Sequence, residues 1–126
     1  MNDPQTRASS RPLISILVPV FNEEENLPVL YQRVSAVTGQ LADRYDFEFV
    51  FTDNHSTDGS FTVLEKLAAG DRRIRVFRFS KNFGFQRSIM TGYMKTLGDA
   101  AIQIDCDLQD PPELFGEFLA KFEEGY

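Results

Sequence analysis

Apolar residues gather in four short runs along the chain. Residues 13–18 are almost all aliphatic, which is typical of a strand buried on both faces of a sheet. Three more strands are predicted at residues 47–52, 74–79 and 101–105. The third of these four runs alternates with Arg75 and Arg78, and this pattern indicates a strand near a sheet edge.

Between the runs, apolar residues recur every three or four positions, which is the spacing of a helix with one buried face. Helices are predicted at residues 27–41, 61–69 and 86–97. Gly98 is a candidate C-cap for the third helix. Asp110, followed by two prolines, predicts the start of a final helix. Strands that alternate with helices predict one α/β unit with a parallel sheet and right-handed crossovers.

Polar residues cluster where each predicted strand ends. Asn22 and Glu23 follow the first strand, and residues 53–58, 81–84 and 105–109 follow the other three. Ligands of open parallel sheets bind beyond the carboxyl ends of the strands, near the point where the strand order reverses. The clustering therefore predicts a ligand site at this edge of the sheet.

The segment after the fourth run carries a candidate metal site. If the strand reaches Asp105, then Asp105 and Asp107 project to one side and Cys106 points away. Mg²⁺ is commonly held by one or two carboxylates together with substrate phosphates, and Gln109 adds a neutral oxygen nearby. The alternative is that these are solvated loop acids before a helix, and the spacing alone favours that alternative.

Composition narrows the class of protein. The chain has 126 residues, 42% of them hydrophobic, which is enough for one modest domain with a core. Its formal net charge of −6 argues against nucleic acid as a partner. The single cysteine excludes an internal disulfide and a cysteine-based metal cluster, and twelve Phe without Trp indicate a Phe-packed core. No apolar run reaches the length of a membrane span, and residues 1–12 are predicted to be a disordered leader.

Four segments together resemble the family 2 glycosyltransferases with a GT-A fold. They read ILVPVFNEE at 16–24, TDNHSTDGS at 52–60, KNFG at 81–84 and DCDLQDPPE at 105–113. The resemblance runs from residue 13 to 126, and the last segment is most similar to the polyprenyl-phosphate sugar transferases, such as dolichol-phosphate mannosyltransferase and undecaprenyl-phosphate glycosyltransferases. It implies a Rossmann-like nucleotide-binding half, with a parallel sheet in the order 3-2-1-4 and helices on both faces.

The resemblance also implies roles for individual residues. Pro19, Phe21 and Glu23 would line the pocket for the nucleotide base and ribose, and Asp53 would contact the base or ribose. The donor diphosphate would bind against Mg²⁺ or Mn²⁺, with the metal ligands supplied by Asp105, Asp107 and Gln109.

The implied reaction is an inverting transfer of a sugar from a UDP- or GDP-sugar to a polyprenyl phosphate. The full-length protein would be membrane-associated and act on the cytoplasmic side, whereas this part would be soluble. The resemblance implies that the family's catalytic domain continues well beyond the segments matched here, and that its catalytic base would lie outside this chain. We therefore expect residues 13–126 to form the donor-binding part, able to bind nucleotide but inactive in transfer by itself.

One departure from the family pattern concerns the second segment. A second acid usually follows the position of Asp53, but this chain has Asn54 and then His55. The resemblance therefore does not identify the nucleotide base of the donor. His55 is expected to be an exposed loop residue, and Cys106 a small buried core residue. Lys81 and Arg87 could approach the diphosphate, although the turn-forming residues Asn82 and Gly84 account for this loop almost as well.

Three other functions fit parts of the pattern. A signalling receiver domain matches the length, the acidity and the alternating units, but its acidic pair and its phospho-acceptor Asp would fall at residues 19–22 and 80–82, where this chain has other residues. A nucleotidyltransferase would use a similar metal–diphosphate site. A non-catalytic assembly module is the third alternative, because a sheet edge left open could pair with another chain and cause self-association.

Overall fold

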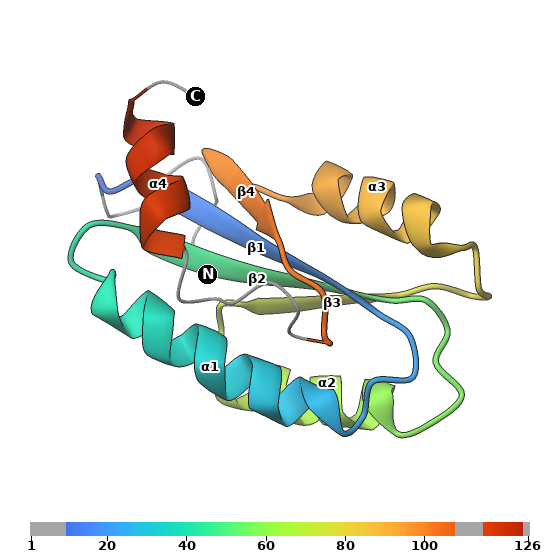
Figure 1. Cartoon of the computed structure of the whole chain (residues 1–126). Helices are drawn as coiled ribbons and strands as arrows, with labels where there is room; N and C mark the ends of the chain where they lie inside the picture. The colour runs from blue at the N-terminus through green and yellow to red at the C-terminus, as the bar shows by residue number, and fades with distance from the viewer. Residues whose placement is uncertain (1–9, 108–114, 125–126) are drawn as a thin grey trace.

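The computed structural model describes residues 10–107 and 115–124, apart from the side chains of Phe118 and Phe122. Strands and helices alternate along the chain (Figure 1). The elements are β1 (Leu13–Val20), α1 (Asn26–Gln40), β2 (Asp46–Asp53), α2 (Ser60–Gly70), β3 (Ile74–Arg78), α3 (Phe85–Lys95), β4 (Ala100–Gln103) and α4 (Phe115–Glu123).

The strands form one parallel sheet in the order β3-β2-β1-β4, as predicted. β1 pairs with β2 over its whole length and with β4 on its other side, and because helices also cover both faces of the sheet, all eight of its residues are buried. β3 lies at one edge, which confirms the interpretation of its alternating arginines. Within the described residues β4 forms the other edge, and pairing of that edge with another chain stays a prediction.

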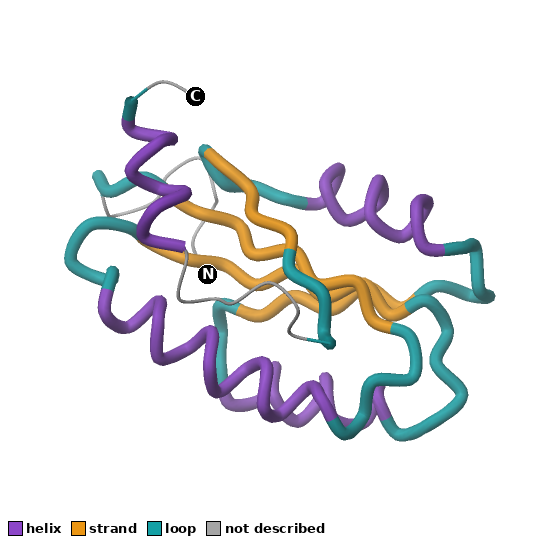
Figure 2. Tube along the Cα trace, in the orientation of Figure 1, coloured by secondary structure: helices purple, strands orange, loops and turns teal. Residues whose placement is uncertain are grey.

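Helices cover both faces of the sheet, as predicted (Figure 2). α1 and α2 lie on one face, and α3 lies on the other. Alternate residues of β1 and β2, including Ile16, Phe49 and Phe51, belong to the main core with residues of α1 and α2, and α4 adds Phe115 and Leu119. The Phe-packed core is therefore confirmed on this face.

The face that α3 covers is built differently. Leu17 of β1 lies against Gly92, where a β-carbon would collide with the leucine side chain. Nearer the start of the helix, the hydroxyl oxygens of Thr52 and Ser88 are 2.9 Å apart in a buried hydrogen bond. Small and hydroxyl-bearing residues thus let α3 approach the sheet closely.

Some predicted boundaries were wrong. The fourth strand was expected to reach Asp105, but β4 ends at Gln103. Ile104 still donates its N–H to Leu17 O, after which the chain turns and buries Cys106 beside Pro19. Asp105 is therefore a loop residue, and strand alternation does not set its direction.

The end of α3 also differs from the prediction. α3 ends at Lys95 with Thr96 as its C-cap, so Gly98 is not the cap; its N–H donates instead to Ser15 Oγ. The start of the final helix predicted at Asp110 lies outside the described residues, as does most of the predicted leader.

Candidate functional site

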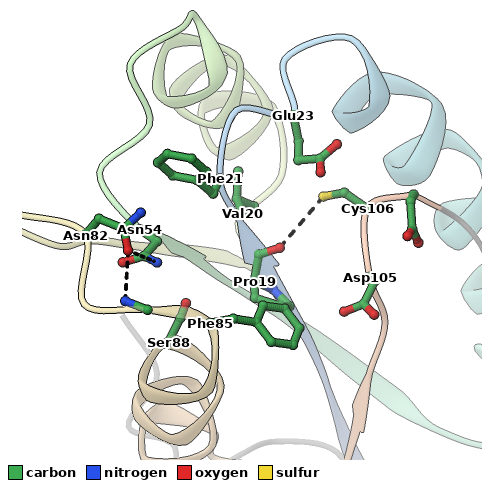
Figure 3. Close-up of a pocket in the computed structure, with 12 residues that line it drawn as sticks. Pro19, Val20, Phe21, Glu23, Asn54, Asn82, Phe85, Ser88, Asp105 and Cys106 are labelled. Carbon is green, nitrogen blue, oxygen red and sulfur yellow. Dashed lines mark hydrogen bonds between the residues drawn. The ribbon is translucent and has the colours of Figure 1, made fainter.

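A cleft of about 500 Å³ opens at the carboxyl edge of the sheet, where the segments after all four strands meet (Figure 3). This is the edge that the sequence predicted. Its lining consists of Pro19, Val20, Phe21, Glu23, Asn54, Asn82, Gly84, Phe85, Ser88, Asp105, Cys106 and Asp107. Five of the predicted site residues therefore line one cavity: Pro19, Phe21, Glu23, Asp105 and Asp107.

The end of β1 and the loop after it form the central part of the cleft. Pro19 and Val20 are the last residues of the strand, and the Phe21 side chain beyond them is 43% exposed. Asn22 adopts a positive φ of 54°, and its side-chain oxygen accepts the N–H of Thr57 at 2.8 Å. Because asparagine tolerates this conformation better than most residues, the sequence can turn sharply here and present Glu23 to the cleft.

One side of the cleft is acidic. Figure 3 shows the carboxylates of Glu23 and Asp105 on the same side, near the Cys106 thiol. Burial raises the pKa of that thiol, and the negative charges of Glu23, Asp105 and Asp107 raise it further. Cys106 is a buried residue, as expected, and it supports a loop that gathers carboxylates rather than acting as a thiolate.

The other side of the cleft carries amides. Asn54, at the end of β2, donates a hydrogen bond from Nδ2 to Asn82 Oδ1 at 2.9 Å. Phe85 and Ser88 lie below this pair on the first turn of α3. Sequence reasoning did not assign a binding role to these four residues; the signal available was that each follows a strand end or opens the next helix.

Asp53 takes a different position from the other predicted residues. Its side chain is fully buried, and Oδ1 accepts hydrogen bonds from the N–H and hydroxyl of Ser56. Oδ2 has no hydrogen bond among the described residues, and it lies 3.4 Å from Arg78 Nε. Asp53 is not among the residues that line the cleft, so its contact with a base or ribose stays a prediction.

The donor atoms of the acidic side suit a hard divalent cation. Asp105 and Asp107 line the cleft and carry carboxylates, while Gln109 lies outside the described residues. Within residues 10–107 and 115–124 no group of three or more His, Cys, Asp or Glu forms a metal site by itself. Such an incomplete oxygen set fits Mg²⁺ or Mn²⁺ that takes further ligands from water and a bound diphosphate.

Lys81, in the loop after β3, and Arg87, in the first turn of α3, do not line the cleft. The Lys81 ammonium lies 5.2 Å from the ring centre of Phe83, and the Arg87 guanidinium lies 5.5 Å from it. His55 is exposed, as expected, with Nδ1 3.1 Å from Phe79 O. In the part of the chain that the structure describes, no helix has the length and apolar character needed to cross a bilayer.

Comparison with known proteins connects this cleft to a family. A glycosyltransferase from Bacillus subtilis, YkcC, whose own role is uncharacterized, is 42% identical over 112 residues. An undecaprenyl-phosphate 4-deoxy-4-formamido-L-arabinose transferase from Pseudomonas fluorescens is 39% identical over 114 residues, and a bactoprenol glucosyl transferase from Shigella phage SfX is 38% identical over 112. The matches cover 89%, 90% and 89% of this chain, and 34%, 33% and 36% of these proteins. The chain thus spans about a third of the length of the curated relatives it matches.

Solved structures agree on the fold. A mannosyltransferase from Pyrobaculum calidifontis, in complex with GDP-Man and Mn²⁺, superposes with a TM-score of 0.67 at 19% identity, over 86% of this chain and 34% of that one. Glucosyl-3-phosphoglycerate synthase from Mycobacterium tuberculosis, in complex with UDP, gives a TM-score of 0.62 at 26% identity, over 86% and 39%. These neighbours confirm the GT-A, Rossmann-like class. The model of the glycosyl transferase family 2 matches residues 15–126, and the chain belongs to that family.

Proposed function

We propose that this chain is the donor-binding part of a polyprenyl-phosphate sugar transferase. In the whole protein, a sugar would pass from a nucleotide-diphosphate sugar to a polyprenyl phosphate, with inversion at the sugar carbon. The names of two relatives, an undecaprenyl-phosphate transferase and a bactoprenol transferase, support the lipid acceptor. The GDP-Man and UDP complexes of the structural neighbours support a nucleotide donor. The family match favours this function over a receiver domain.

One observation carries the proposal. One cleft at the carboxyl edge of the sheet joins Phe21 and Glu23 from the first loop to Asp105 and Asp107 from the last, although more than eighty residues separate the two pairs in the sequence. A nucleotide diphosphate has an aromatic base at one end and an anionic group at the other. A cleft with exposed aromatic rings and a carboxylate cluster suits both ends when a cation joins the cluster.

Different residues of the chain would bind different parts of the donor. Pro19, Phe21 and Glu23 would hold the base and ribose, while Asp105, Asp107 and Gln109 would hold Mg²⁺ or Mn²⁺. The bound cation would neutralise the diphosphate and stabilise the nucleoside diphosphate as leaving group. Asp53 would contribute to the base or ribose pocket from its buried position at the end of β2. The lipid acceptor would bind outside this chain, and the catalytic base would also lie outside it. The whole protein would work at the cytoplasmic side of a membrane.

Calorimetric titration of the 126-residue chain with UDP, GDP and their sugars, with and without Mn²⁺, tests the proposal. We expect metal-dependent binding that falls at least tenfold in Asp105→Asn and Asp107→Asn, because each loses a charged metal ligand. Asp43→Asn is the matched control, since Asp43 is an exposed acid at the opposite end of the sheet. Wild-type protein that binds no nucleotide at any Mn²⁺ concentration would contradict the proposal.

Transfer itself is a separate expectation. The chain covers about a third of its curated relatives, so we expect it to bind donor without transferring sugar when it is tested by itself. Incubation with a radiolabelled nucleotide sugar and undecaprenyl phosphate measures this directly. Labelled lipid product from the 126-residue chain would show that the remaining part of the relatives is not needed.

A further inference from the structure

The amide side of the cleft is held by a short network centred on Asn54 and Asn82, which we call the amide pair. Asn54 is buried at the end of β2, and its backbone N–H donates to Val20 O at 2.8 Å. Its side-chain Oδ1 accepts the N–H of Phe83 at 2.9 Å, and its Nδ2 donates to Asn82 Oδ1. Asn54 therefore ties the end of β1 to the loop between β3 and α3.

Backbone donors fix the orientation of both amides. A backbone N–H can only donate, so the atom of Asn54 that faces Phe83 N must be its oxygen. In the same way, the atom of Asn82 that faces Gly84 N at 2.8 Å must be its oxygen. Asn82 Oδ1 then accepts both Gly84 N–H and Asn54 Nδ2–H, and a flip of either amide would lose hydrogen bonds.

This arrangement leaves a donor at the cleft. Asn82 is exposed and lines the cleft, and its Nδ2 has no hydrogen-bond partner within residues 10–107 and 115–124. Because its oxygen is already used, Asn82 can offer a ligand only N–H groups. The ligand atom that it takes must then be an acceptor oxygen or nitrogen.

The surroundings indicate which part of a nucleotide this acceptor belongs to. The carboxylates of Glu23 and Asp105 lie on the other side of the cleft, where a cation and a diphosphate would gather. On the amide side the exposed rings are those of Phe21 and Phe85, which are 43% and 56% exposed. A neutral amide near exposed aromatic rings suits an uncharged, flat group with carbonyl oxygens.

We propose that Asn82 donates a hydrogen bond to an acceptor atom of the nucleoside, and that Asn54 is the positioning residue that aims it. This inference rests on the proposed function, which supplies the nucleotide. Gly84 takes part through its backbone: its N–H donates to Asn82 Oδ1, and its positive φ of 92° lets the chain turn here into α3, which starts at the next residue. The chain thus has Asn54 where the family pattern has an acid, and an amide can donate to Asn82 while it accepts from Phe83, whereas an ionised carboxylate can only accept.

Two substitutions separate the two roles. Asn82→Asp keeps an acceptor for Gly84 N and for Asn54 Nδ2, so the loop stays held, but it removes the donor that faces the ligand. Asn54→Asp still accepts from Phe83 N, but at neutral pH its carboxylate faces Asn82 Oδ1 without a proton to donate. Gln32→Glu, on the exposed face of α1, is the matched amide-to-acid control.

The first experiment needs no ligand. Amide hydrogen exchange of the ¹⁵N-labelled chain, followed by NMR, reports on the Phe83 and Gly84 N–H groups. We expect Asn54→Asp to speed exchange at Gly84 severalfold, while Asn82→Asp and Gln32→Glu leave it within about twofold of wild type. Unchanged exchange at Gly84 in Asn54→Asp would overturn the positioning role, whether or not the chain binds nucleotide.

The second experiment is calorimetric titration with UDP and with GDP in the presence of Mn²⁺, from pH 7.5 downward. We expect Asn82→Asp to weaken binding by about tenfold, since it loses a hydrogen bond and adds a negative charge. Asn54→Asp should also bind more weakly at pH 7.5, and its deficit relative to wild type should shrink as the pH falls, because a protonated aspartic acid can again donate to Asn82.

The outcomes distinguish the two proposals. If wild type binds nucleotide and Asn82→Asp binds as tightly, the contact proposed for Asn82 is wrong while the proposed function stands. A deficit of Asn54→Asp that does not change with pH would contradict the donation on which the positioning role depends. If wild type binds no nucleotide, the proposed function fails together with the ligand role of Asn82, and the exchange experiment alone decides whether Asn54 holds the loop.

Discussion

The two ends of the sheet use polar side chains in opposite ways. At the amino end, Glu48 is 7% exposed and accepts hydrogen bonds from the Ser15 hydroxyl, from Leu97 N at 2.7 Å and from the Arg75 guanidinium at 2.7 and 3.2 Å. At the carboxyl end, Asp105 is only partly buried, and the hydrogen bond found for it in the described residues comes from Gln103 at 3.3 Å.

Burial explains the difference. A buried carboxylate without partners costs several kcal/mol, so the groups at the amino end must satisfy one another. At the open carboxyl end, water can solvate the acids of the cleft until a ligand replaces it. The Glu48 network at the amino end therefore contributes to stability, whereas the partly solvated Asp105 at the carboxyl end can bind a ligand without losing such a network. Substitutions at the two ends should separate these effects.

The largest expected effect is at Glu48. Glu48→Ala should lower the free energy of unfolding by about 3 kcal/mol, because Arg75, Ser15 and the Leu97 N–H lose their shared acceptor. Urea denaturation followed by circular dichroism measures the change. Glu65→Ala, at an exposed position on α2, should change the free energy by less than about 0.5 kcal/mol. Equal effects of the two substitutions would contradict the stabilising role of the Glu48 network.

The second-largest change in stability is expected at Gly92, in helix α3, which runs between the two ends of the sheet. Gly92→Ala should destabilise the chain by about 1–2 kcal/mol, because a new methyl group would overlap Leu17 in a packed region and outweigh the gain in helix propensity. Gly39→Ala, in α1 with open space around it, should instead stabilise by about 0.5 kcal/mol. Thermal melting of both variants checks the opposite signs.

The carboxyl end was predicted from the sequence better than the amino end. The cleft was predictable because parallel strands bring their carboxyl ends to one edge, so polar segments far apart in sequence must converge. No comparable rule predicts the network of Glu48, since it depends on which face of β2 meets α3. Glu48 and Arg75 are read from the sequence as ordinary charged residues of strands.

Within the cleft, the residues that sequence reasoning missed depend on long-range contacts. The pairing of Asn54 with Asn82 joins residues 28 positions apart. For Asp53, the motif indicated a ligand contact, but the structure adds that Ser56 and Arg78 surround its carboxylate. The position of Asp105 was also not predictable, because the burial of Cys106 against Pro19, rather than strand alternation, determines the path of its loop.

A smaller effect is expected at Asp71, also at the amino end, in the connection between α2 and β3. The hydrogen bonds from the Arg73 side chain, and further ones from Tyr31 and the Arg73 N–H, lower the Asp71 pKa from 3.8 to about 2. A lowered pKa in the folded state stabilises the fold above pH 4, and this contribution is lost as the pH falls from about 4 toward 2.

Asp71→Asn tests this pH dependence. We expect the variant to lose about 1 kcal/mol of stability at pH 7, a value reduced because the pair is partly solvated, and to differ little from wild type near pH 2.5. Urea midpoints measured between pH 7 and 2.5 show whether the two curves converge. Asp43→Asn should instead remain close to wild type across the range. A constant difference between Asp71→Asn and wild type would mean that packing of Tyr31, rather than ionisation, is responsible.

The smallest expected change in stability is at the cleft itself. Asp105→Asn should alter the free energy of unfolding by less than about 0.5 kcal/mol, because the carboxylate is partly solvated and shares its side of the cleft with the negative charge of Glu23. Since removing one of two neighbouring like charges relieves repulsion, a slight stabilisation is also consistent with the structure. Urea denaturation without metal measures the stability of the free chain, and a repeat with Mn²⁺ and UDP measures the stabilisation by ligand. The ligand should stabilise wild type more than Asp105→Asn. A loss as large as that in Glu48→Ala would place Asp105 among the structural acids and contradict the contrast between the two ends.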